Sequence, residues 1–241
     1  MDNILISLAH FCDKHGPRIL LVTQSSQNGA RSDDLLLPDY PIDSYCESCL
    51  LHFPQGNETI RSMRSTLDEK CYVTTQYSSI RYQLMNSIIR RCFSEETMVY
   101  DNMPLVFYDQ LRGLNLIMGF KLYDANARGN ERRYCFILTI DSKDSDAAMK
   151  ILSNNWNFII GGFFKMINHI NESHNKELKN QSNERDHTNG LSPLMSNYLR
   201  GNKSKLAKNL VELTNDKNIF LKMHKWNTYL LNMLITNASP K

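Results

Sequence analysis

Long apolar runs and an N-terminal leader are both missing from this 241-residue chain. No stretch of about 18 apolar residues occurs, which excludes a membrane-spanning helix. Asp2 precedes a short apolar run, without a basic n-region or a cleavage site, so no secretory signal is expected. The formal net charge of +3 is too small to indicate nucleic-acid binding, which usually needs a concentrated basic face. We therefore expect a cytoplasmic protein with no nucleic-acid partner.

The familiar catalytic motifs are absent as well. The sequence contains no Gly-rich phosphate loop, no G-x-S-x-G elbow and no H-E-x-x-H helix. It also lacks a pair of carboxylates spaced for acid–base work. From the residues alone we predict an interaction domain with no intrinsic catalytic site and no cofactor.

Hydrophobic patterning predicts an α+β domain with one antiparallel sheet of about five strands and helices on both faces. One helix, capped by Ser78 or Ser79, should end near Phe93. A second is expected over 143–170, where apolar residues recur at spacings of three and four. The expected strands cover 3–11, 18–23, 104–109, 114–122 and 133–141.

The same patterns predict how the chain is divided. Residues 1–170 form the main domain, with an irregular insertion at about 24–70 that is rich in proline and turn residues. Residues 171–190 contain one large apolar side chain, Leu178, and are predicted to be a polar linker. Residues 191–241 are predicted to be a helical segment, in which two pieces break near 214–216.

Six scattered cysteines, without a signal peptide, are interpreted as reduced thiols. Cys46 and Cys49 form a C-x-x-C pair with His52 three residues further on. One such pair supplies two of the four ligands that a structural zinc site needs. We therefore predict no metal site, and Cys46, Cys49 and His52 remain the candidate ligands. Cys12, three residues before His15, is interpreted as a small core residue.

A polar loop joins the strands predicted at 114–122 and 133–141. It carries Arg128, Arg132 and Arg133, and Gly129 follows the first of them. An exposed arginine on a loop held by a rigid sheet is a common component of binding and catalytic sites. Composition alone favours an ordinary solvated turn, because most connections of this kind are polar.

Several short motifs, in order along the chain, resemble the folliculin family. The run His10 to Arg18 (HFCDKHGPR) is similar to the opening of folliculins, and Cys46 to Cys49 (CESC) to the C-E-x-C of the following loop. Ala127-Arg128-Gly129 resembles the family's A-R-G hairpin loop. Residues 153–161 (SNNWNFIIG) resemble the start of its long helix.

The resemblance implies a longin-type domain that forms a heterodimer with a folliculin-interacting-protein-type subunit through longin domains. It implies that the complex stimulates GTP hydrolysis by a Rag-family GTPase heterodimer. The complex would thereby signal amino-acid availability to the TOR kinase, at a vacuolar or lysosomal membrane reached through its partners. The family's catalytic arginine corresponds to Arg128, supported by Ala127 and Gly129. The chain ends before the DENN-type domain of longer members, so a non-catalytic longin adaptor in GTPase binding or amino-acid permease trafficking is the alternative.

Overall fold

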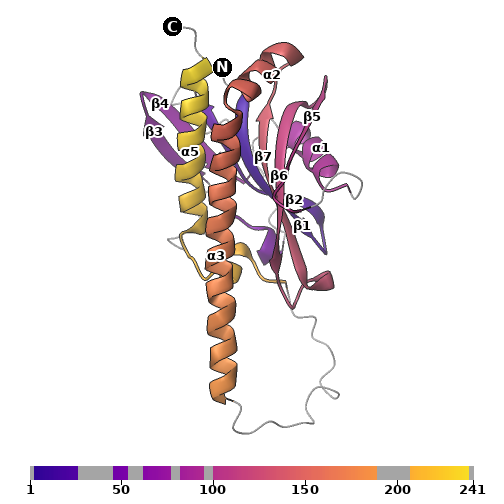
Figure 1. Cartoon of the computed structure of the whole chain (residues 1–241), viewed down its shortest axis with the longest axis vertical. Coiled ribbons are helices and arrows are strands. Elements are labelled where there is room, and N and C mark those ends of the chain that lie inside the picture. Colours follow the sequence, from indigo (N-terminus) through magenta and orange to yellow (C-terminus); the bar gives the residue numbers. More distant parts are fainter. Residues whose placement is uncertain are drawn as a thin grey trace.

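A single antiparallel sheet of seven strands forms the centre of the computed structural model, which describes residues 3–26, 46–53, 62–76, 82–94, 100–188 and 207–238. The strand order across the sheet is β3-β4-β2-β1-β7-β6-β5 (Figure 1). The strands are β1 (Ile4–Cys12), β2 (Gly16–Ser26), β3 (Ser62–Leu67), β4 (Lys70–Thr75), β5 (Pro104–Asp109), β6 (Gly113–Tyr123) and β7 (Glu131–Ile140).

The five predicted strands are β1, β2, β5, β6 and β7, and they are contiguous in the sheet. The predicted count was too low, because the β3–β4 hairpin extends the sheet beyond β2. Strand β3 is mostly polar, and its hairpin turns at Asp68 and Glu69, which take positive φ values of 47° and 64°. Two-residue hairpin turns that need positive φ are usually recognised in a sequence by Asn-Gly or Asp-Gly. The Asp68-Glu69 pair does not match this pattern.

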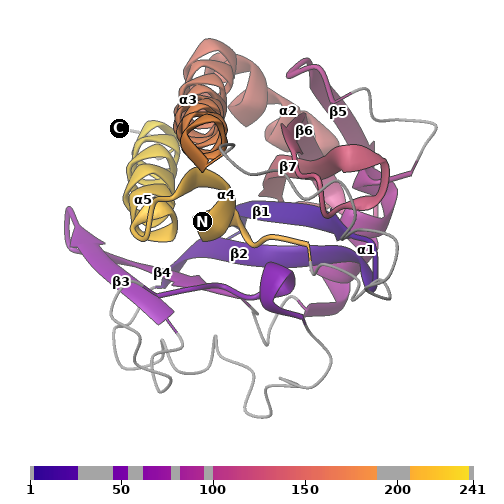
Figure 2. The same cartoon turned by 90° about the horizontal axis from the view of Figure 1, so that it is seen from below.

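Helices cover both faces of the sheet, which confirms the predicted α+β class. Helix α1 (Tyr82–Cys92) packs on one face against Leu5, Ala9 and Ile137, and the alternate residues Ile6 and Leu8 face the other side. On that side α3 and α5 lie next to each other (Figure 2). The alternation follows from the two-residue period of a strand, which sends neighbouring side chains to opposite faces.

The helix predicted at 143–170 is two helices, α2 (Ser145–Asn154) and α3 (Trp156–Thr188), separated by Asn155. Asp144 begins α2, where its carboxylate accepts hydrogen bonds from the N–H groups of Asp146 and Ala147. Helix α3 continues through most of the stretch predicted to be a polar linker. Tertiary contacts support this polar extension: His174 is buried, and its Nδ1 lies 2.8 Å from the Leu213 carbonyl oxygen.

Two helices complete the described chain, α4 (Leu210–Thr214) and α5 (Ile219–Ala238). The predicted break between them is confirmed, with Asn215 in the left-handed conformation at the end of α4. Asn209 and Glu212 form a capping box that begins α4. Ser78, Ser79 and the predicted helical residues 191–206 lie outside the described residues. None of the described helices has the length and apolar character needed to cross a membrane.

Helix α5 is held to the sheet and to α3 by specific contacts. His224 is buried, and its ring nitrogens each lie 2.7 Å from a hydroxyl oxygen, of Thr74 on β4 and of Ser65 on β3. Burial lowers the pKa of His224 to about 4, so the ring is neutral at neutral pH. At Gly162 of α3 a side chain would collide with the Leu230 side chain of α5, so the glycine permits the close approach of the two helices.

Candidate functional site

The loop between β6 and β7 is short and closed by hydrogen bonds within itself. Its last turn is a 3-10 segment, Arg128–Asn130, in which Gly129 has φ of 70°. The N–H of Asp124 donates to the Asn130 carbonyl at 3.0 Å, and the N–H of Asn130 donates to the Ala127 carbonyl at 3.0 Å. Because Tyr123 and Glu131 pair directly below it, the loop continues a regular two-stranded ladder.

Two other parts of the chain brace this loop. The buried carboxylate of Asp124 accepts a hydrogen bond from the Asn126 N–H at 3.0 Å, and another from the Lys208 N–H, before α4, at 2.9 Å. Asp13 of the β1–β2 turn accepts a hydrogen bond from the Arg128 N–H at 2.9 Å. The loop backbone that carries Arg128 is therefore fixed by contacts with two distant parts of the chain.

The side chain of Arg128 is exposed, in contrast to its braced backbone. Its guanidinium has no hydrogen bond or ion pair with any residue that the structure describes. Nothing lies within 4 Å of the position that a Cβ would take at Gly129, so the tip of the loop is open. The buried Ala127 anchors the loop just before the arginine. This arrangement presents a planar cation that is free to bridge two oxygens of an anion.

The other two arginines predicted in the loop lie on β7, and the side chain of each contacts another residue of the chain. Arg132 is buried, with Nη2 3.1 Å from Nδ1 of His10 and no hydrogen-bond partner for Nε or Nη1 among the described residues. Burial lowers the pKa of His10 well below its ordinary value, and Arg132 adds to the shift, so the neutral ring accepts this hydrogen bond. Arg133 is exposed and lies over the Tyr100 ring, 5.5 Å from its centroid.

Four metal-ligating side chains meet beside this loop. Cys12 ends β1 and His15 lies in the turn that follows it. Cys49 ends a 3-10 segment, Glu47–Cys49, and Cys46 is the residue before that segment. Their ligand atoms all lie within 4.8 Å of one another. The Sγ–Sγ distances are 3.7 Å for Cys12–Cys46 and 3.6 Å for Cys46–Cys49, so no disulfide is formed.

The structure keeps the predicted cysteine pair together but leaves out the histidine expected beside it. His52 has its Nε2 3.0 Å from the Glu47 carbonyl oxygen and lies outside the cluster. Cys12 is buried as predicted, but its thiol belongs to the cluster. One signal for the cluster was available in the sequence: Cys12-x-x-His15 has the same spacing as Cys46-x-x-Cys49.

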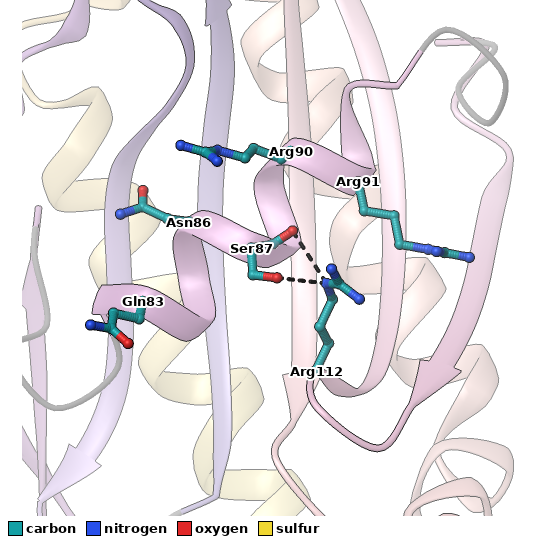
Figure 3. Close-up of a pocket in the computed structure, with 6 residues that line it drawn as sticks. All are labelled: Gln83, Asn86, Ser87, Arg90, Arg91 and Arg112. Carbon is teal, nitrogen blue, oxygen red and sulfur yellow. Dashed lines mark hydrogen bonds between the residues drawn. The ribbon is translucent and has the colours of Figure 1, made fainter.

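A shallow pocket lies on the α1 side, at the opposite end of β6 from Arg128 (Figure 3). There Arg112 donates to the Ser87 hydroxyl from Nε at 2.7 Å and to the Asp109 carboxylate from Nη1 at 2.7 Å. No carboxylate, histidine or cysteine lies among the lining residues, so they offer no general base or activated nucleophile. They are Gln83, Asn86, Ser87, Arg90, Arg91 and Arg112.

Comparison with known proteins identifies similar chains over almost the whole length. A family model for folliculin, described as a vesicle coat protein involved in Golgi to plasma membrane transport, matches residues 70–234. The protein LST7 of Saccharomyces cerevisiae is 60% identical over 238 residues, which cover 98% of each chain. Folliculin of Bos taurus is 24% identical over 270 aligned residues, which cover 95% of this chain and 45% of the bovine protein.

Proposed function

Because the chain belongs to the folliculin family, we propose that it is one subunit of a heterodimeric GTPase-activating complex and supplies Arg128 to a Rag-family GTPase. The chain itself performs no chemistry in this proposal and needs no cofactor. Hydrolysis takes place in the nucleotide pocket of the GTPase, and the arginine enters that pocket from outside.

The observation that carries the proposal is the combination of a braced backbone and a free guanidinium at Arg128. Hydrolysis of GTP spreads negative charge over the transferred phosphoryl group, and an arginine supplied by a second protein neutralises it. A finger of this kind has to reach beyond its own protein without first breaking contacts there. Arg128 meets that requirement among the described residues, because its backbone N–H is hydrogen-bonded to Asp13 while its guanidinium has no partner there.

Gly129 favours the same use of the loop. Its φ of 70° lies in the left-handed region that glycine adopts at little cost, and the turn needs it directly after the arginine. The absence of a side chain there leaves room for a nucleotide-binding surface to approach Arg128. Ala127, buried on the other side of the arginine, fixes the start of the turn.

For the folliculin-interacting-protein-type partner, we propose docking along the β5 edge of the sheet. Every residue of β5 is only partly buried, and β5 pairs with β6 alone in the described sheet. Exposed apolar side chains flank the strand: Met103 is 68% exposed and Leu111 is 83% exposed. An open edge with apolar side chains at both ends is suited to β-strand addition by a second longin domain.

Met103→Asp combined with Leu111→Asp should weaken partner binding by at least about tenfold, because two charges would then be desolvated at the interface. Both side chains are exposed, so the free energy of unfolding should change little. Leu67→Asp, at the end of β3 on the opposite edge, is the matched control and should leave binding unchanged. Co-purification or calorimetric titration with the partner subunit measures the effect, and equal losses in the two variants would argue against the β5 edge.

We further propose that this complex acts from the cytoplasm at the vacuolar or lysosomal membrane. Its partners supply the peripheral membrane association, and it reports amino-acid availability to the TOR kinase. This placement rests on the motifs that resemble folliculins, among them His10 to Arg18 and Ala127-Arg128-Gly129.

The alternative is a non-catalytic longin adaptor that bridges a DENN-containing partner to GTPases or to permease trafficking. The transport description of the family model favours it. Single-turnover GTP hydrolysis, measured with each GTPase of the heterodimer loaded separately, distinguishes the activator from the adaptor. Saturating complex should accelerate hydrolysis by one of them. Rates identical with and without complex, for both GTPases, would leave the adaptor function.

A further inference from the structure

We propose that Cys12, His15, Cys46 and Cys49 form a structural zinc site that joins the β1–β2 turn to the segment Glu47–Cys49. The two halves of the site come from positions about thirty residues apart in the sequence. Each half has the same C-x-x-[C/H] spacing, which lets one tight turn direct two ligand atoms to a common point.

Four of the six ligand–ligand distances fit a tetrahedral zinc ion closely, and all six are within 4.8 Å. With Zn–S of about 2.3 Å and Zn–N of about 2.0 Å, tetrahedral geometry places two sulfurs about 3.8 Å apart and a sulfur about 3.5 Å from a nitrogen. Here the sulfur pairs Cys12–Cys46 and Cys46–Cys49 are separated by 3.7 and 3.6 Å. Nδ1 of His15 lies 3.6 Å from the Cys12 sulfur and 3.5 Å from that of Cys49. A hydrogen bond accounts for any one of these contacts, and a shared ligand accounts for all four of them together.

The donor set selects the metal. Three sulfurs and one imidazole nitrogen in a tetrahedron are typical of structural zinc, whereas calcium and magnesium require oxygen ligands. No described carboxylate belongs to the cluster, and with four protein ligands no position is left for a water molecule. The Ser48 hydroxyl, 3.1 Å from the Cys46 sulfur, is placed to support a thiolate from outside the ligand set.

A buried arginine supplies a second, independent observation. Arg132 is 1% exposed, and no described carboxylate forms an ion pair with it. A buried cation is costly without a counter-charge. Zn²⁺ bound by three thiolates and a neutral imidazole has a net charge of −1. Cys12 and the buried carboxylate of Asp124 both interact electrostatically with the Arg132 guanidinium, so the occupied site would add to the counter-charge of Asp124.

The site also explains what holds the segment Glu47–Cys49 against the sheet. Gln76, directly after β4, donates a hydrogen bond to the Cys49 carbonyl and accepts one from the nearby Leu51 N–H at 3.0 Å. The zinc ion would add the covalent cross-link. Asp13, which holds the backbone of Arg128, lies between the two ligands of the β1–β2 turn, so zinc would also fix the base of the arginine loop.

The test is the metal content of the full chain, purified without chelator or metal-affinity resin and measured by inductively coupled plasma mass spectrometry. We expect about one zinc per chain, falling severalfold in Cys46→Ser. Two matched controls should retain it: Cys71→Ser, a cysteine outside the cluster, and His52→Ala, the histidine adjacent to it. Reconstitution with Co²⁺ should give the strong visible absorption of a tetrahedral, thiolate-ligated ion, which Cys46→Ser changes even if it retains some metal.

Three outcomes would overturn the proposal. The first is folded wild-type chain with no zinc and no Co²⁺ spectrum. The second is a Cys46–Cys49 disulfide in intact protein, detected by mass spectrometry without reductant. The third is an unchanged zinc content and cobalt spectrum in Cys46→Ser. Because none of these readouts involves a GTPase, the metal site and the activating function are tested separately.

Discussion

A purified complex with Arg128→Ala should bind its GTPase as the wild type does, yet stimulate single-turnover GTP hydrolysis about 10³-fold less. The expected loss follows from the gain that an arginine finger supplies, which is on the order of 10³–10⁵. Folding should be unaffected, because the Arg128 side chain is exposed and its N–H, which any residue but proline retains, makes the hydrogen bond to Asp13.

Two further variants serve as controls for Arg128→Ala. Arg133→Ala removes an exposed arginine on the neighbouring strand β7 and should leave stimulation within about twofold of wild type. Arg128→Lys keeps the charge but loses the planar fork that bridges two oxygens, so we expect most of the stimulation to be lost. Full stimulation by Arg128→Ala, at saturating complex, would remove the catalytic role.

Gly113→Ala should lower the free energy of unfolding by about 3–5 kcal/mol, or prevent folding altogether. Gly113 begins β6 with φ of 65°, and a Cβ there would overlap the Ile140 carbonyl oxygen and lie 3.1 Å from the Cα of Asp141. The neighbouring atoms are backbone at the end of β7, a central strand, and in the residue after it, and they cannot move without disturbing the sheet. The penalty therefore combines a strained conformation with a steric collision.

Gly129→Ala is the matched control, because it has nearly the same backbone conformation without the collision. Its φ is 70°, and nothing lies within 4 Å of the added Cβ. We expect a cost of about 1–2 kcal/mol, the penalty of a left-handed non-glycine residue alone. Urea denaturation of both variants measures the difference. Equal destabilisation of the two would mean that Gly113 is not crowded by β7.

Much of the sheet was accessible from the sequence, because its central strands are apolar and separated by turn residues. The β3–β4 hairpin was not, since its strands are short, β3 is polar and its turn lacks glycine. The extension of α3 to Thr188 was missed for a related reason. Local composition there is polar, and the helix depends on contacts with the distant α4, such as that of His174 with Leu213.

The candidate sites show the same division between local and non-local information. Composition did not distinguish Arg128 from Arg132 and Arg133, and only the family resemblance selected it. The structure adds a physical difference, because Arg132 is buried against His10 and Arg133 lies over Tyr100. The Cys/His cluster depends on two segments being brought together by the fold. The equal spacings of Cys12-x-x-His15 and Cys46-x-x-Cys49 are visible in the sequence, but the proximity of the two pairs is not.

The most direct test of Arg128 as an arginine finger is binding to a GTPase that mimics the transition state. The affinity of the complex is measured by titration against each GTPase loaded with GDP, with and without aluminium fluoride. An arginine that acts on the transferring phosphoryl group binds this analogue more tightly than the ground state. We predict that wild-type complex prefers the fluoride-loaded form of one GTPase by at least about tenfold, and that Arg128→Ala abolishes the preference. An equal preference in wild type and Arg128→Ala would contradict the assignment.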